Sequence, residues 1–171
     1  MASQSKPAAP SFPLAGVARD GFTTDNEATA TCFCGDVQMA FPTSGEGLVN
    51  TFVCHCADCR KVTASMFASN FTAKNSHIRY VRGEDRIKEW GQAATPASGN
   101  SMTNGWCDTC GTLMYRYSSA APDVKYMRIG TVDDFSLHET KLRPQVELFV
   151  DSRVDWLQPI EGVKQAHGMG Q

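Results

Sequence analysis

The sequence predicts a mainly β protein in which bound metal, rather than disulfide bonds, reinforces the core. Two observations indicate this fold class. Short segments of alternating polarity recur at intervals of about ten residues, as in all-β proteins. All seven cysteines fall into three tight clusters. A chain of 171 residues with this pattern suits one domain with a buried core.

Each expected strand combines apolar alternation with a flanking turn signal. The expected strands are Val37–Phe41, Thr51–Val53, Ala64–Phe71, Ile78–Val81, Ile87–Trp90, Leu113–Tyr117, Tyr126–Ile129 and Val146–Val150. Short helical turns are expected at Arg60–Ala64 and Val132–Phe135, and a loop rich in Ser, Gly, Asn and Pro over Gly91–Asn104.

Composition sets the expected boundaries. Residues 1–24 are rich in Ala, Ser and Pro and cannot bury enough apolar surface to offset their ordering entropy, so a flexible N-terminal tail is expected. Residues 25–162 form a single zinc-binding catalytic domain in this interpretation, and residues 163–171 a C-terminal tail.

Charge and hydropathy narrow the range of partners. The formal net charge is −2 and the pI about 6.1, with no basic run, which argues against nucleic-acid binding. No apolar run resembles a secretory signal or a membrane span. We therefore expect a soluble cytoplasmic protein with small-molecule partners and no membrane partner, and an exposed strand edge leaves a homodimer open.

The cysteine clusters favour metal over disulfides. They are Cys32-Phe-Cys34, Cys54-His-Cys56-Ala-Asp-Cys59 and Cys107-Asp-Thr-Cys110. Seven is an odd number, and cysteines this close together chelate one ion more readily than they bond to each other. Soft thiolates at this spacing favour zinc, with iron as the lesser alternative.

The spacing suggests that four of the seven cysteines bind one ion and three bind another. Two bidentate pairs, Cys32 with Cys34 and Cys107 with Cys110, complete one tetrahedral structural zinc site. Cys54, Cys56 and Cys59 remain, and three ligands within six residues leave one side of a second ion open, as in catalytic zinc sites.

The alternative is a closed second site. His55 should point away from an ion held by its two neighbours, since alternate residues of an extended segment face opposite ways. His77 or His138 could close the site from elsewhere in the chain, although surface positions are expected for both and for His167.

The motifs resemble those of the glutathione-dependent formaldehyde-activating enzyme and centromere protein V family. The similarity spans roughly residues 27–160, and it includes the motifs Cys-x-Cys-Gly, Cys-His-Cys-x-x-Cys-Arg and Cys-x-x-Cys-Gly. Further matching segments are Gly35–Val37, Cys59–Lys61, Gly83–Asp85, Ser98–Gly99, Gly130–Asp134 and Pro144–Trp156.

The resemblance implies a β-tent fold with one structural and one catalytic zinc. It gives Cys32, Cys34, Cys107 and Cys110 the structural role and Cys54, Cys56 and Cys59 the catalytic one. The implied activity is that of a carbon–sulfur lyase, which joins glutathione to formaldehyde as S-hydroxymethylglutathione.

An ion with a free position can bind a thiol and favour its nucleophilic thiolate form. Glutathione also carries two carboxylates, and Arg60 and Lys61, directly after Cys59, are the nearest basic pair. Two alternatives remain: a tailoring enzyme of the same family that acts on a larger metabolite, and a zinc-stabilised interaction module without catalysis.

Overall fold

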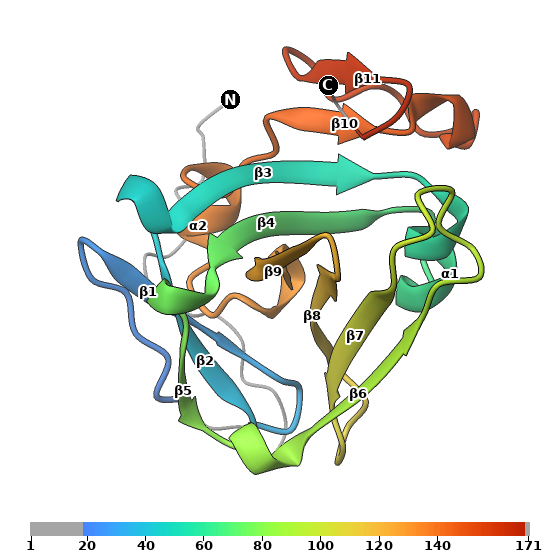
Figure 1. Ribbon diagram of the computed structural model, residues 1–171. Coiled ribbons are helices and arrows are strands. Elements are labelled where there is room, and N and C mark those ends of the chain that lie inside the picture. Colours follow the sequence, from blue (N-terminus) through green and yellow to red (C-terminus); the bar gives the residue numbers. More distant parts are fainter. Residues whose placement is uncertain (1–18, 170–171) are drawn as a thin grey trace, which may run out of the picture.

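Two β-sheets form the framework of the computed structural model, which describes residues 19–169 (Figure 1). The smaller sheet contains β1 (Glu27–Thr31), β2 (Gln38–Pro42) and β5 (Arg79–Arg82), all antiparallel. The larger sheet has the order β11-β10-β3-β4-β9-β8-β7-β6. The prediction of a mainly β fold is confirmed.

The strands of the larger sheet run antiparallel from β3 to β6, whereas β10 lies parallel to both β3 and β11. The bounds of its strands are β3 (Leu48–Cys54), β4 (Ala68–Lys74), β6 (Ile87–Gln92), β7 (Met102–Cys107), β8 (Leu113–Ser118), β9 (Ala121–Arg128), β10 (Val146–Leu148) and β11 (Lys164–Ala166).

The apolar core lies between the two sheets. Met39 and Phe41 of the small sheet are fully buried, as are Phe71 and Met127 of the large one. The rings of Phe41 and Phe71 lie 4.5 Å apart, within the range of favourable aromatic contacts. Successive side chains of a strand face opposite sides of its sheet, so the apolar alternation in the sequence places one set of side chains in this layer.

The opposite face of the large sheet is polar where it is covered. Directly paired residues of neighbouring strands share a face, and Asn70 of β4 pairs with Arg128 of β9. One step further across the sheet, Arg116 of β8 pairs with Asn104 of β7. All four side chains are buried. A buried polar layer of this kind is unusual and indicates a site.

Two short helices complete the fold. The helix α1 (Ala57–Thr63) follows the end of β3, and α2 (Ser136–Glu139) precedes β10 (Figure 1). The helix α1 ends at Ala64, which adopts a left-handed conformation with φ of 50°. Single 3-10 turns occur at Gly45–Gly47, Asn75–His77, Glu84–Arg86, Ile129–Thr131 and Val150–Ser152.

Several expected element bounds were wrong. The strand expected at Ala64–Phe71 begins only at Ala68, because residues 64–67 form the turn that follows α1 and starts with the left-handed Ala64. No helical turn forms over Val132–Phe135; turns form on either side of it instead. These errors arise where apolar runs are short and do not distinguish strand from helix.

The predicted tails need correction as well. Lys164–Ala166, placed in a C-terminal tail over 163–171, forms strand β11 against β10. Its residues are mostly exposed, so hydrogen bonding to β10 rather than apolar burial holds it. Most of the expected N-terminal tail, residues 1–18, lies outside the described residues. Asp20, also placed in that tail, forms an ion pair with Arg82 at 2.7 Å.

Within the described part of the chain, no helix combines the length and apolar character needed to cross a membrane.

Candidate metal and thiol site

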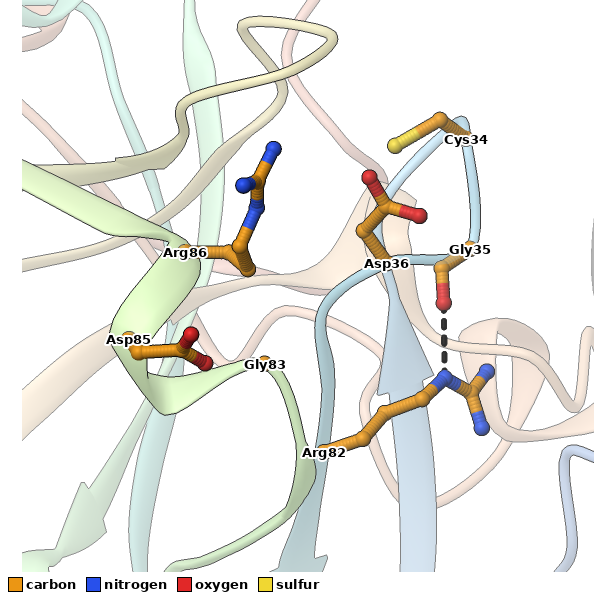
Figure 2. Close-up of a pocket in the computed structure, with 7 residues that line it drawn as sticks. All are labelled: Cys34, Gly35, Asp36, Arg82, Gly83, Asp85 and Arg86. Carbon is orange, nitrogen blue, oxygen red and sulfur yellow. Dashed lines mark hydrogen bonds between the residues drawn. The ribbon is translucent and has the colours of Figure 1, made fainter.

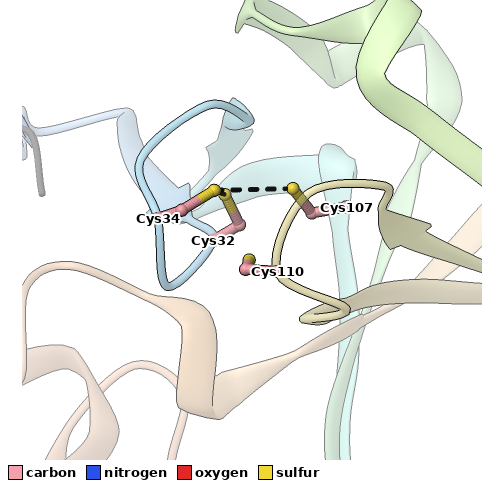
Figure 3. A group of neighbouring side chains, drawn as sticks. All are labelled: Cys32, Cys34, Cys107 and Cys110. Atoms are coloured by element: carbon pink, nitrogen blue, oxygen red, sulfur yellow. Dashed lines mark hydrogen bonds between the residues drawn. The ribbon is translucent and has the colours of Figure 1, made fainter. Parts of the chain in front are cut away.

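Two tight turns, about 73 residues apart in the chain, bring together four cysteines (Figure 3). The Gly35 N–H donates to the Cys32 carbonyl at 3.0 Å, and the Gly111 N–H donates to the Cys107 carbonyl at 2.9 Å. Both glycines have positive φ, 86° and 74°, which the absence of a side chain permits. The Cys32–Cys34 segment is therefore a turn of the same kind as the Cys107–Cys110 segment.

The sulfur positions fit a tetrahedral ion. The Sγ atoms of Cys32 and Cys34 lie 3.5 Å apart, and those of Cys34 and Cys107 lie 3.7 Å apart. Four sulfurs at the usual zinc–sulfur distance of 2.3 Å from one ion lie about 3.8 Å from each other. The arrangement of Cys32, Cys34, Cys107 and Cys110 thus matches a closed structural site.

Local hydrogen bonds already favour thiolate at parts of this site. Burial alone would raise the pKa of Cys110, but the hydroxyl and backbone N–H of Thr112 outweigh it and lower the pKa to about 6. The Val37 N–H points to the Cys32 sulfur at 3.2 Å. Burial nevertheless raises the pKa of Cys32 and Cys34, so a cation is needed to stabilise four thiolates together.

A shallow pocket of about 630 Å³ borders this site (Figure 2). Cys34 and Asp36 line one side, and Arg82 and Arg86 line the other. Both arginines already have carboxylate partners, Asp20 for Arg82 and Asp108 for Arg86. The two arginines of the pocket are therefore already paired, and its cysteine belongs to the four-cysteine group.

The second cysteine group lies where β3 passes into α1. Cys54 ends the strand, Cys56 is the N-terminal cap of the helix, and Cys59 lies in its first turn. The three sulfurs lie within 4.8 Å of one another. Among residues 19–169, no His, Asp or Glu joins this group as a fourth ligand. The geometry therefore fits an ion with one side open.

Charge is unevenly distributed within this group. The neighbouring sulfurs of Cys54 and Cys59 lower the pKa of Cys56 to about 2 and, conversely, those of Cys56 and Cys59 raise the pKa of Cys54. Three buried sulfurs this close cannot all carry a negative charge without a cation. The donor set and its burial fit a soft divalent ion such as zinc.

His55 faces away from the sulfurs, as expected. Its Nε2 lies 3.0 Å from the Glu147 carboxylate on β10, and both side chains are buried. Glu147 also accepts hydrogen bonds from Arg153 at 2.8 Å and from the Ile160 N–H at 2.6 Å. This network fastens the cysteine loop to the C-terminal segment. Of the other histidines, His77 and His167 are exposed and His138 is half-buried.

The expected substrate donors lie on α1. Arg60 donates to the Ser152 carbonyl at 3.2 Å and contacts the Met66 sulfur, and Lys61 is exposed. Apart from the Arg60 N–H, which donates to the Cys56 carbonyl at 3.0 Å at the start of α1, neither residue has a hydrogen bond or ion pair with the cysteine group among the described residues. Their role in binding substrate remains a prediction.

Two buried arginines beside the cysteines were missed in the sequence. Arg116 places Nη1 3.7 Å from the Cys59 sulfur, and Arg128 lies next to it across the sheet and interacts electrostatically with all three thiols. Their strands read as alternating apolar segments in which an arginine is normally solvent-facing. The local pattern carried no signal for these two positions, because this face of the sheet is covered by residues far away in the chain, such as Cys59 beside Arg116.

The family of this chain can be assigned by comparison with known proteins. A search of curated proteins found no match. A crystal structure of a Rhodobacter sphaeroides protein matches with a TM-score of 0.48 and 17% identity, covering 81% of this chain and 98% of that one. The family model for the glutathione-dependent formaldehyde-activating enzyme matches residues 27–152. That match includes both cysteine groups and most of the domain, and the chain therefore belongs to the glutathione-dependent formaldehyde-activating enzyme family.

Proposed function

We propose that this protein is a zinc-dependent carbon–sulfur lyase that makes or breaks a thiol adduct of a small electrophile, with glutathione and formaldehyde as the first pair to test. The observation that supports this proposal is the three-sulfur group of Cys54, Cys56 and Cys59, which has no fourth protein ligand among the described residues. The family match supports a glutathione-related substrate.

Each part of the site has a role in this proposal. A zinc ion held there would supply a Lewis acid that favours the thiolate form of an incoming thiol. The three cysteines hold the ion, and the His55–Glu147 contact keeps their loop in place. Arg60 and Lys61 remain candidates for the carboxylates of glutathione, which would require Arg60 to leave the Ser152 carbonyl.

The direct test combines metal analysis with product identification. The purified protein should contain about two zinc ions per chain, and incubation with glutathione and formaldehyde should accelerate formation of an adduct that is heavier than glutathione by the mass of one formaldehyde. Cys56→Ser should reduce the zinc content by about one and abolish the acceleration. Full activity and normal zinc content in Cys56→Ser would refute the mechanism.

The same assay distinguishes the formaldehyde reaction from the alternative of a tailoring enzyme that acts on a larger metabolite. A wild-type protein with two zinc ions that does not accelerate this reaction, yet binds glutathione at the three-cysteine group, would indicate another electrophile. A screen of larger aldehydes and epoxides with product masses would then identify its class.

One observation favours the interaction module as a second candidate. Cys54 and Cys59 are only 4% and 7% exposed, which also suits a purely structural ion. Two zinc ions that resist chelators equally and bind no thiol would support that function.

The seven free thiols fit a reducing compartment, and we place the reaction in the cytoplasm on that ground. The proposal allows either a monomer or a homodimer.

A further inference from the structure

We infer that Arg116 and Arg128 supply a fixed positive charge that makes the open side of the three-cysteine group accept an anionic ligand, a thiolate above all, in preference to a neutral one. This inference deepens the proposed function and relies on it only for the identity of the thiol. The selection of anions over neutral ligands can be measured without any turnover.

Position is the first support. Arg116 on β8 and Arg128 on β9 belong to the polar face of the large sheet, and each is 6% exposed. One nitrogen of Arg116 lies 3.7 Å from the Cys59 sulfur, and another lies 3.4 Å from the Asp58 carboxylate. Arg116 thus lies between the cysteine group and the Asp58 carboxylate, whose negative charge offsets that of the arginine.

The partners of Arg128 are the second support. Its Nη1 donates to the Asn70 side chain, whereas its Nε and Nη2 are buried without a hydrogen-bond partner among the described residues. No carboxylate in residues 19–169 lies within ion-pair distance of it. Burial lowers the pKa of Arg128 to about 10, so the guanidinium remains charged at neutral pH.

A buried charge without a counter-charge is strongly unfavourable. The negative groups that interact with Arg128 are the thiols of Cys59, Cys54 and Cys56, which act to raise its pKa. The arginine and the sulfur group therefore stabilise each other's charged forms. A merely structural arginine would be expected to have a carboxylate partner in the fold, as Arg82 and Arg153 do.

Charge counting shows what the pair adds. Three thiolates around a divalent ion carry a net charge of −1, and Asp58 contributes another −1. Arg116 and Arg128 contribute +2, which brings the whole site to zero. A thiolate arriving on the open side then meets a neutral site, whereas without the arginines it would meet a charge of −2. A neutral ligand is almost indifferent to this difference.

The test uses cobalt in place of zinc, because thiolate-bound cobalt absorbs visible light and its spectrum changes with its ligands. The probes are azide, 2-mercaptoethanol and imidazole, titrated into the cobalt-loaded protein. The four-cysteine site has no open position, so its absorption serves as a constant background. Arg116→Gln and Arg128→Gln remove one charge each, and Arg79→Gln, on a surface pair with Glu27, is the matched control.

Each arginine variant should bind azide about tenfold more weakly than the wild type at pH 7, as expected for the loss of one opposite charge within several ångströms. The pH of half-maximal 2-mercaptoethanol binding should rise by about one unit. Imidazole affinity should stay within about twofold, and Arg79→Gln should match the wild type throughout. Equal losses of azide and imidazole affinity, or no loss of either, would overturn the inference.

Asp58→Asn removes a negative charge, so it should change azide affinity in the opposite direction to the arginine variants. Asp58 is partly exposed and its amide analogue can still accept the Thr95 hydroxyl, which lies 2.7 Å away, so this variant should fold even if an arginine variant does not. It should bind azide more tightly than the wild type by severalfold. Unchanged or weaker azide binding in Asp58→Asn would contradict the inference on its own.

The two proposals fail separately. If azide binding follows these predictions but no thiol binds the wild-type protein, the proposed function is wrong and the charge selection stands. If thiols bind and react but azide and imidazole respond alike in every variant, the enzyme proposal stands and the role of the arginines is refuted.

Discussion

Replacing one ligand in each cysteine group should distinguish the two metal sites by stability. Cys110 and Cys56 form a matched pair because both are half-buried. Serine preserves the main polar contact of each: Cys110 lies 3.2 Å from the Thr112 hydroxyl, and Cys56 caps α1 by accepting from the Cys59 N–H. Serine is a favourable helix cap but a poor zinc ligand, so each variant should lose one ion.

The size of the difference follows from the loops that the ions close. Cys34 and Cys107 are separated by 73 residues, whereas Cys54 and Cys59 are separated by only five. The entropic cost of closing a loop grows with the logarithm of its length, so the two closures differ by about 2.4 kcal/mol. Metal–sulfur bonding is similar in the two sites and cancels to a first approximation.

Cys110→Ser should therefore lower the free energy of unfolding by about 2 kcal/mol more than Cys56→Ser. Urea unfolding followed by far-ultraviolet circular dichroism measures this difference, which corresponds to a midpoint lower by about 1 M. Zinc analysis of both variants must show that each lost one ion. Equal midpoints in variants that had each lost one zinc would refute the reasoning, as would a larger loss in Cys56→Ser.

Three further substitutions test other parts of the structure. Hydrogen bonds from the Ile160 N–H and other donors outweigh burial and hold the pKa of Glu147 below its ordinary value of 4.5. The stability it provides is therefore complete above that value and is lost as the pH falls below it. Glu147→Gln should destabilise by roughly 1–3 kcal/mol at pH 7, and its gap to the wild type in urea midpoints should narrow below pH 4.5; a constant gap would contradict this. Gly105→Ala would place a Cβ 2.5 Å from the ring of Tyr115 and should cost about 1–3 kcal/mol, whereas Gly130→Ala, with open space around it, serves as a control; equal thermal midpoints would show that the ring moves freely. Ala64→Gly relieves a left-handed residue at the end of α1 and should raise the unfolding free energy by about 0.5–1 kcal/mol, and a decrease would show that the side chain of Ala64 contributes packing.

The candidate metal ligands could be identified in the sequence because chelation depends on residues that are close together in the chain. A Cys-x-x-Cys-Gly segment holds two sulfurs near one ion through its own turn, so Cys107 and Cys110 required no knowledge of the rest of the fold. The same is true of Cys54, Cys56 and Cys59, which lie within six residues. The division into four and three followed from counting, and the sulfur positions agree with it.

The bounds of helices and strands were harder to predict from the sequence where helix and strand signals compete. The segment after Cys59 has too few residues to show either period clearly, and the first four residues of the expected strand form the turn that links α1 to β4. The pairing of β11 with β10 also left little trace, since Lys164 and its neighbours are mostly exposed and polar. Backbone hydrogen bonds hold that strand, and they are independent of side-chain type.

By itself, the sequence determined the class of the fold, the family and the grouping of the candidate metal ligands, since these depend on residue types at short and regular spacing. Only the tertiary structure decided that Arg116 and Arg128 lie beside the three cysteines and that Glu147 holds their loop through His55. These residues come from β8, β9 and β10, and strand pairing brings them to the end of β3 from 57 to 92 positions away in the chain. The charge around the site is a property of that pairing, because electrostatic interactions depend on distance in space and not on order in the chain.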